Sequence, residues 1–171
     1  MLILITGGVK SGKSRRALEI AKSEWSFPVS FIATAEALDE EMRCRIEKHK
    51  QERNDLAGPI TNGGFITIEE PLELDKAIAA SGSRVLVDCI PMWVNNLLYY
   101  QREKDFDRIL EIFLQSGKDR IVVTNETGMG NIPFDEYTRH YNLLLAEANR
   151  RVAAAADRLE LMVCGIPLRV K

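Results

Sequence analysis

The chain has 171 residues, of which 46% are hydrophobic and 28% charged, and its formal net charge is −2. These values predict one globular domain over residues 1–171 with a sizeable core, and they argue against a nucleic-acid partner or membrane insertion. The N-terminal apolar stretch is too short for a signal peptide. The three cysteines form no CxxC pair, which argues against a disulfide framework and a zinc site. We therefore expect a cytoplasmic protein.

Short apolar runs, most of them rich in β-branched residues, predict strands at 2–6, 29–34, 65–70, 84–89, 120–125, 159–164 and 168–171. Segments of helical period lie between most of them, at 13–24, 39–55, 72–81, 92–101, 105–117 and 136–156. This alternation predicts an α/β fold whose mainly parallel sheet of about seven strands carries helices on both faces. The tight link at 165–167 predicts an antiparallel C-terminal hairpin, and the turn-rich stretch 58–64 predicts a loop. Cys89 and Cys164 end apolar runs and are predicted to be buried thiols.

A phosphate-binding motif follows the first predicted strand at once and opens the first helix. "GGVKSGKS" fits GxxxxGK[ST] and consists of Gly7, Gly8, Val9, Lys10, Ser11, Gly12, Lys13 and Ser14. Its glycines let successive N–H groups point at phosphate oxygens, and the helix N-terminus adds favourable dipole charge. Lys13 is expected at the outer phosphates and Ser14 on Mg²⁺. The motif predicts a P-loop nucleotide-binding protein.

The segment 39–55 is unusually charged for a helix and offers little apolar surface for packing. At helical spacing Arg45, His49 and Arg53 fall on one face. Taken alone, such a segment is typical of a solvated helix face that happens to include a histidine. The other histidine, His140, is interpreted as a surface or packing residue of the last helix.

Candidate ligand-binding residues stand at the carboxyl ends of the predicted strands, where open parallel sheets bind ligands. They are Ala33-Thr34-Ala35, Asp88 and Asn125-Glu126. Asp88 closes "VLVD" and is expected to orient Mg²⁺ or otherwise contact the nucleotide. "TNETGMG", residues 124–130, is interpreted as a site loop, with an ordinary turn as the alternative.

Two common classes of P-loop protein are not favoured. No NKxD element is present to read guanine, and the "DLAG" at 55–58 follows the polar helix instead of a strand. No recognisable arginine-rich lid is present either, so an ordinary nucleoside monophosphate kinase is not favoured.

Over essentially its whole length the chain resembles the bifunctional adenosylcobinamide kinase / adenosylcobinamide-phosphate guanylyltransferase family of cobalamin biosynthesis. The resemblance rests on "ITGGVKSGKSRRAL", "FIATAEALDEEMRCRIEKHKQER", "FITIEEP", "VLVDCIPMWVNNLL", "VVTNETGMGNIP" and "AAAADRLELMVCGIPLRVK". It implies a RecA-like P-loop fold, a homotrimer, ATP and GTP as substrates, and Mg²⁺.

The resemblance also implies roles for particular residues. His49 would be the covalently guanylylated residue, and Lys13 would assist phosphoryl transfer. Nucleotide contacts would fall on the loop Gly7 to Ser14 and on Ala33, Thr34, Ala35, Lys50, Gln51, Glu52, Arg53, Glu69 and Asp88. Ser14 and Asp88 would hold the metal.

The residues around His49 fit such a role independently, since imidazole is a nucleophile only when neutral and nearby cations lower its pKa. Lys48, Lys50, Arg45 and Arg53 are expected to do this. Two alternatives stay open. One is a P-loop kinase of a small molecule in which His49 is only a surface residue, and the other is a non-catalytic GTP-binding regulatory protein. A covalent nucleotide on His49 would exclude both.

Overall fold

The computed structural model describes residues 1–57, 64–130 and 132–171. Its strands are β1 (Leu2–Gly7), β2 (Val29–Ala33), β3 (Phe65–Glu69), β4 (Arg84–Asp88), β5 (Asp119–Val123), β6 (Arg158–Val163) and β7 (Ile166–Arg169). Its helices are α1 (Lys13–Glu24), α2 (Glu40–Ala57), α3 (Leu74–Ala80), α4 (Ile90–Tyr99), α5 (Phe106–Leu114) and α6 (Glu136–Ala155), with a short 3-10 helix η2 (Glu103–Asp105). Each predicted strand and helix is present. The loop predicted at 58–64 lies, apart from Gly64, outside the described residues.

The strands form one sheet in the order β3-β2-β4-β5-β1-β6-β7. Neighbouring strands pair in parallel, except that β6 and β7 pair antiparallel. The predicted mainly parallel sheet and the C-terminal hairpin are therefore confirmed. This order places the carboxyl ends of β4, β5 and β1 next to one another, so Asp88, the segment after Val123 and the phosphate loop share one edge of the sheet.

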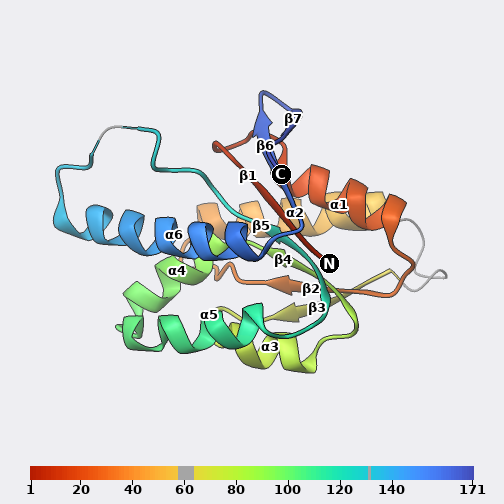
Figure 1. Ribbon diagram of the computed structural model, residues 1–171, viewed down its shortest axis with the longest axis horizontal. Helices are drawn as coiled ribbons and strands as arrows, with labels where there is room; N and C mark the ends of the chain where they lie inside the picture. Colours follow the sequence, from red (N-terminus) through yellow and green to blue (C-terminus); the bar gives the residue numbers. More distant parts are fainter. Residues whose placement is uncertain (58–63, 131) are drawn as a thin grey trace.

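Hydrophobic cores cover both faces of the sheet because successive side chains of a strand point to opposite faces. Ile3 and Ile5 of β1 pack in the core that contains α1, whereas Leu2 and Leu4 pack in the core formed with α3, α4, α5 and α6. Figure 1 shows α1 and α2 on one side of the sheet and α3 and α5 on the other. The arrangement confirms the prediction of helices on both faces.

Two predictions near the C-terminus differ from the structure. Cys164 and Gly165 have positive φ angles of 51° and 85° and form a tight two-residue turn, so β7 begins two residues earlier than predicted. The prediction of a buried Cys164 thiol was therefore wrong, because this residue is exposed at the turn. The other thiol predicted to be buried, that of Cys89 after β4, is partly buried. Pro167 pairs with Met162 on the edge strand β7, a position that tolerates proline.

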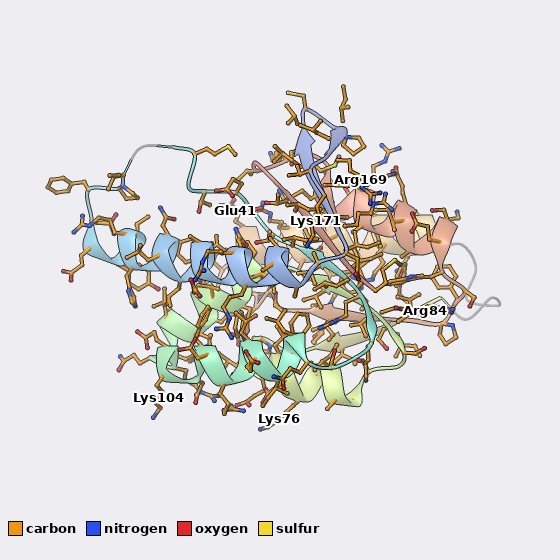
Figure 2. All side chains as sticks on the ribbon, in the orientation of Figure 1. Glu41, Lys76, Arg84, Lys104, Arg169 and Lys171 are labelled. Carbon is orange, nitrogen blue, oxygen red and sulfur yellow. The ribbon has the colours of Figure 1, made fainter. Side chains whose placement is uncertain are left out.

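Charged side chains lie mainly on the surface, as Figure 2 shows for Lys76 and Lys104, which project away from the ribbon. The buried charged residues among those described are Lys13, Arg53, Asp75, Arg120 and Glu160. Two of them, Lys13 and Arg53, belong to segments predicted to bind nucleotide. In the described part of the chain, none of the helices has the length and apolar character required to cross a membrane.

Candidate nucleotide site

The predicted phosphate loop connects β1 to α1. A Cβ built on Gly7, whose φ is 146°, would lie 2.5 Å from the carbonyl oxygen of Met162, so glycine is required there. Gly12 has the left-handed φ of 93° and is the N-cap of α1. The N-terminus of α1 therefore opens into the loop, where its free N–H groups can bind phosphate.

Lys13 lies across this loop. Its Nζ donates to the carbonyl oxygen of Gly8 at 2.5 Å and lies 3.5 Å from Oγ of Ser11. Burial lowers the pKa of the Lys13 ammonium. The loop is also supported from the C-terminal hairpin, because the N–H of Gly165 donates to the carbonyl of Ser11 at 3.1 Å. Apart from the closing "GIPL" of the family resemblance, no sequence signal predicts that contact.

Ser14 and Asp88, the two residues predicted to hold a metal ion, contact each other beside the phosphate loop. Oγ of Ser14 donates to Oδ1 of Asp88 at 3.4 Å. Mg²⁺ prefers oxygen ligands and is commonly held by one or two protein oxygens together with substrate phosphates. The hydroxyl and the carboxylate at this distance fit such an ion.

The charged helix α2 brings His49 to the same carboxylate. Nδ1 of His49 lies 3.8 Å from Oδ2 of Asp88, an ion-pair distance longer than a hydrogen bond. The His49 side chain is 43% exposed, so one edge of the ring remains accessible, while Asp88 is only 13% exposed. The predicted nucleophile and the phosphate loop therefore belong to one site.

The expectation that cations lower the pKa of His49 was wrong. The carboxylate of Asp88 holds the pKa of His49 above its ordinary value, and this effect outweighs the lowering by burial and by Arg45. Lys50 has little influence because its Nζ lies 3.0 Å from Glu69 and 3.5 Å from Glu47. These pairs raise the pKa of Lys50.

The remaining predicted residues of α2 lie on different sides of the helix. Arg53 is 7% exposed, and its guanidinium carbon stacks 4.2 Å from the ring centre of Phe31. Burial lowers the pKa of this guanidinium. Gln51 and Glu52 are exposed, and Gln51 donates to Asp55 at 2.9 Å. Arg53 therefore anchors α2 to the sheet, and Lys50 ties it to Glu69 at the end of β3.

Ala33 is the last residue of β2, Thr34 and Ala35 follow it, and the Thr34 side chain is turned toward the end of β4. Its Oγ1 donates to the carbonyl of Cys89 at 2.6 Å and accepts from the N–H of Cys89 at 2.9 Å. The backbone N–H of Thr34 donates to the carbonyl of Asp88 at 3.1 Å. Asn96, a buried polar residue on the apolar helix α4, donates to the Thr34 carbonyl at 2.8 Å. Sequence reasoning missed this network, which fixes the strand end that carries Asp88.

His140 lies outside the site. It is exposed on α6 and lines a shallow surface depression together with Leu98, Glu103 and Tyr137. This position agrees with its interpretation as a surface histidine.

The sequence and the fold both match known proteins. The sequence model of the family described as "Cobinamide kinase / cobinamide phosphate guanyltransferase" matches residues 3–170. The chain belongs to this family. It is 35% identical to the bifunctional adenosylcobalamin biosynthesis protein CobU of Escherichia coli, with both chains covered completely. It is also 35% identical to the bifunctional protein CobP of Pseudomonas aeruginosa, over 98% of this chain and 96% of that one.

A solved structure supports the fold. The flagellar accessory protein FlaH from Methanocaldococcus jannaschii superimposes with a TM-score of 0.51 at 14% identity, covering 99% of this chain and 77% of that chain. At this identity the likeness concerns the fold alone, and the predicted RecA-like P-loop fold class is confirmed.

Proposed function

We propose that this member of the cobinamide kinase family carries out both activities at the site around Asp88. The observation that carries the proposal is that one carboxylate faces Ser14 of the phosphate loop with Oδ1 and the imidazole of His49 with Oδ2. This arrangement supports a single nucleotide site that combines a phosphate-binding loop with a nucleophile.

In the kinase half-reaction, the hydroxyl of the aminopropanol arm of adenosylcobinamide attacks the γ-phosphorus of ATP or GTP. A new oxygen–phosphorus bond forms, the bond from the γ-phosphorus to the bridging oxygen breaks, and the nucleoside diphosphate leaves. Lys13 would move its ammonium from the Gly8 carbonyl to the outer phosphates, and the N–H groups of the loop would orient them. Ser14 and Asp88 would hold Mg²⁺, which when bound neutralises phosphate charge.

In the guanylyltransferase half-reaction, a ring nitrogen of His49 attacks the α-phosphorus of GTP and pyrophosphate leaves. A phosphate oxygen of adenosylcobinamide phosphate then attacks the histidine-bound phosphorus. The phosphorus–nitrogen bond breaks and adenosylcobinamide-GDP is formed. The covalent intermediate divides one difficult transfer into two easier steps. Arg53 and Lys50 would position α2 during both of them.

The deciding experiment is intact-protein and peptide mass spectrometry after incubation with Mg²⁺ and GTP. We expect a GMP adduct on His49 that is absent in His49→Ala and present in the matched control His140→Ala. If the wild type forms no GMP adduct but still phosphorylates adenosylcobinamide, the kinase-only alternative is correct. GTP binding with neither activity would leave the regulatory alternative.

Two further proposals follow from the family resemblance. A homotrimer is supported by the apolar side chains of Met129, Ile132 and Phe134, which are 79%, 85% and 101% exposed in the single chain. Sedimentation equilibrium tests the proposed homotrimer, since a monomer in solution would refute it.

A cytoplasmic location is supported by three cysteines that are free thiols, and fractionation of the source cells tests it.

A further inference from the structure

Residues 124–130, the predicted site loop, take no part in either of the two proposed half-reactions. This loop leaves β5, which lies between β4 and β1 in the sheet. The N–H of Thr124 donates to the carbonyl of Ile5 at 3.0 Å, and the N–H of Glu126 donates to the carbonyl of Gly7 at 3.2 Å. Glu126 therefore lies directly beside the first residue of the phosphate loop.

A cavity of about 250 Å³ adjoins Glu126, between the ends of β1 and β5 and the helix α6. Two of its polar side chains are already satisfied, because Oγ1 of Thr124 donates to Asn149 at 2.6 Å and Asn149 donates to the Asn125 carbonyl at 2.9 Å. Oγ1 of Thr6, by contrast, is buried and has no hydrogen-bond partner among the described residues. This oxygen does not face the open cavity, and rotation of the Thr6 side chain would let it reach a polar ligand there and relieve the unfavourable lack of a partner.

The carboxylate of Glu126 retains the capacity to accept further hydrogen bonds. Its Oε1 accepts from the N–H of Gly128 at 2.7 Å, and no lysine, arginine or histidine of the described residues forms a salt bridge with it. Asp88, the other carboxylate at the phosphate loop, is already engaged by Ser14 and His49. Glu126 is thus free to bind a hydroxyl group.

We infer that Glu126 binds the acceptor hydroxyl of the kinase half-reaction and that the adjoining cavity holds the hydroxyalkyl arm of the acceptor. This inference rests on the proposed kinase function. As the hydroxyl oxygen bonds to the γ-phosphorus and the bond to the bridging oxygen breaks, the hydroxyl proton passes to the Glu126 carboxylate. The resulting carboxylic acid then returns the proton to solvent.

The size of the cavity agrees with this assignment. Pockets that enclose drug-sized ligands have volumes of roughly 300–1,000 Å³. A cavity of about 250 Å³ is smaller than this range and accommodates a short alcohol arm. The hydroxyl of Thr6, once rotated toward the cavity, would offer the arm a hydrogen bond. Glu126 lines the same cavity and adjoins the phosphate loop through its backbone N–H.

Glu126→Gln is the sharpest test, because the amide keeps the shape and can still accept from Gly128 but cannot take the proton. We expect kcat for phosphorylation of adenosylcobinamide by ATP to fall about 100-fold or more. The KM for ATP and the rate of GMP-adduct formation on His49 should stay at wild-type values. Glu136→Gln, at an exposed position in the first turn of α6, is the matched control. Thr6→Val should raise the KM for adenosylcobinamide and leave the KM for ATP unchanged.

Each outcome decides the assignment. A kinase kcat of Glu126→Gln within about threefold of wild type would overturn it, and so would an equal loss of kinase and adduct formation, which indicates a structural role. A wild type without kinase activity would overturn the proposed kinase function, and this inference with it. Selective loss of the kinase step alone supports Glu126 as the group that receives the hydroxyl.

Discussion

Nδ1 of His49 and Oδ2 of Asp88 face each other at 3.8 Å across the gap between α2 and β4. A carboxylate next to one imidazole nitrogen favours a proton on that nitrogen and leaves the lone pair of the other nitrogen free. In the proposed guanylyltransferase reaction the proton would therefore belong on Nδ1, and Nε2 would be the nitrogen that attacks phosphorus. The pair thus assigns different tasks to the two ring nitrogens.

The first prediction concerns this pair. The GMP adduct of the wild type should be bonded through Nε2, and Asp88→Asn should slow adduct formation at saturating GTP by at least about 100-fold. Asparagine neither favours the proton on Nδ1 nor stabilises the positive charge that develops on the ring. Mass spectrometry measures the rate of adduct formation, and NMR of the adduct identifies the ring nitrogen that is bonded to phosphorus. Asp55→Asn, at an exposed position of α2, is the control. An Nδ1 adduct, or an unchanged rate in Asp88→Asn, would contradict the assignment.

The second prediction compares two neighbouring glycines. Gly7→Ala places a Cβ 2.5 Å from the Met162 carbonyl at a positive φ, whereas a Cβ on Gly8 meets no atom within 4 Å. We expect Gly7→Ala to lower the free energy of unfolding by about 2 kcal/mol, the range of local backbone strain. Gly8→Ala should stay within about 0.5 kcal/mol of wild type. Urea denaturation measures both free energies of unfolding. Similar losses in the two variants would contradict the prediction, because they would show that the loop accommodates a Cβ at Gly7 without strain.

Much of the fold and part of the site could be predicted because their signals are local. The apolar runs at 2–6 and 84–89 predict buried parallel strands, and the strand–glycine loop–helix order around Lys13 predicts the phosphate loop. The place of Asp88 follows from its position at the carboxyl end of a predicted strand, since ligands bind where parallel strands end. These inferences need only residues that are close together in the sequence.

The rest depended on contacts between distant segments. The cations beside His49 suggested a lowered pKa, but the residue that decides its direction is Asp88 of another element. Thr34 was expected at the nucleotide, yet its hydroxyl bonds the backbone of Cys89. Sequence neighbours show which charges are available, and only the folded chain shows which of them meet.

The third prediction tests the Thr34 network. Thr34→Val keeps the shape of the side chain and removes both hydrogen bonds to Cys89, at a fully buried position. We expect a loss of about 1–3 kcal/mol in the free energy of unfolding, because the backbone groups of Cys89 lose their partner. Adduct formation should also slow, since the strand end that carries Asp88 is loosened. Thr67→Val, at an exposed position of β3, is the control and should change neither quantity. A stable Thr34→Val with wild-type rates would refute the positioning role.

The last prediction concerns pH and the buried carboxylate of Glu160, which is 3% exposed. It accepts from Nε of Arg16 at 2.8 Å and from Nε of Arg158 at 2.8 Å. These guanidinium groups, Arg16 foremost, hold the pKa of Glu160 below its ordinary value of 4.5. A lowered folded-state pKa stabilises the protein above the unfolded-state pKa, and this contribution disappears as pH falls through the folded-state value.

Glu160→Gln should therefore cost about 3 kcal/mol at pH 7, the lower end of the range for breaking a buried pair, because Arg16 is partly exposed. The difference from wild type should be constant from pH 7 to about 5. It should narrow below about pH 4.5, because the unfolded chain takes up a proton there and the folded carboxylate, whose pKa is lower, does so only at still lower pH. Glu19→Gln, in an exposed pair with Arg15, should change stability by less than about 1 kcal/mol throughout. Denaturation curves across this pH range measure the difference. A gap between Glu160→Gln and wild type that persists undiminished at pH 3 would mean that lost packing, and not the lost charge, explains the destabilisation.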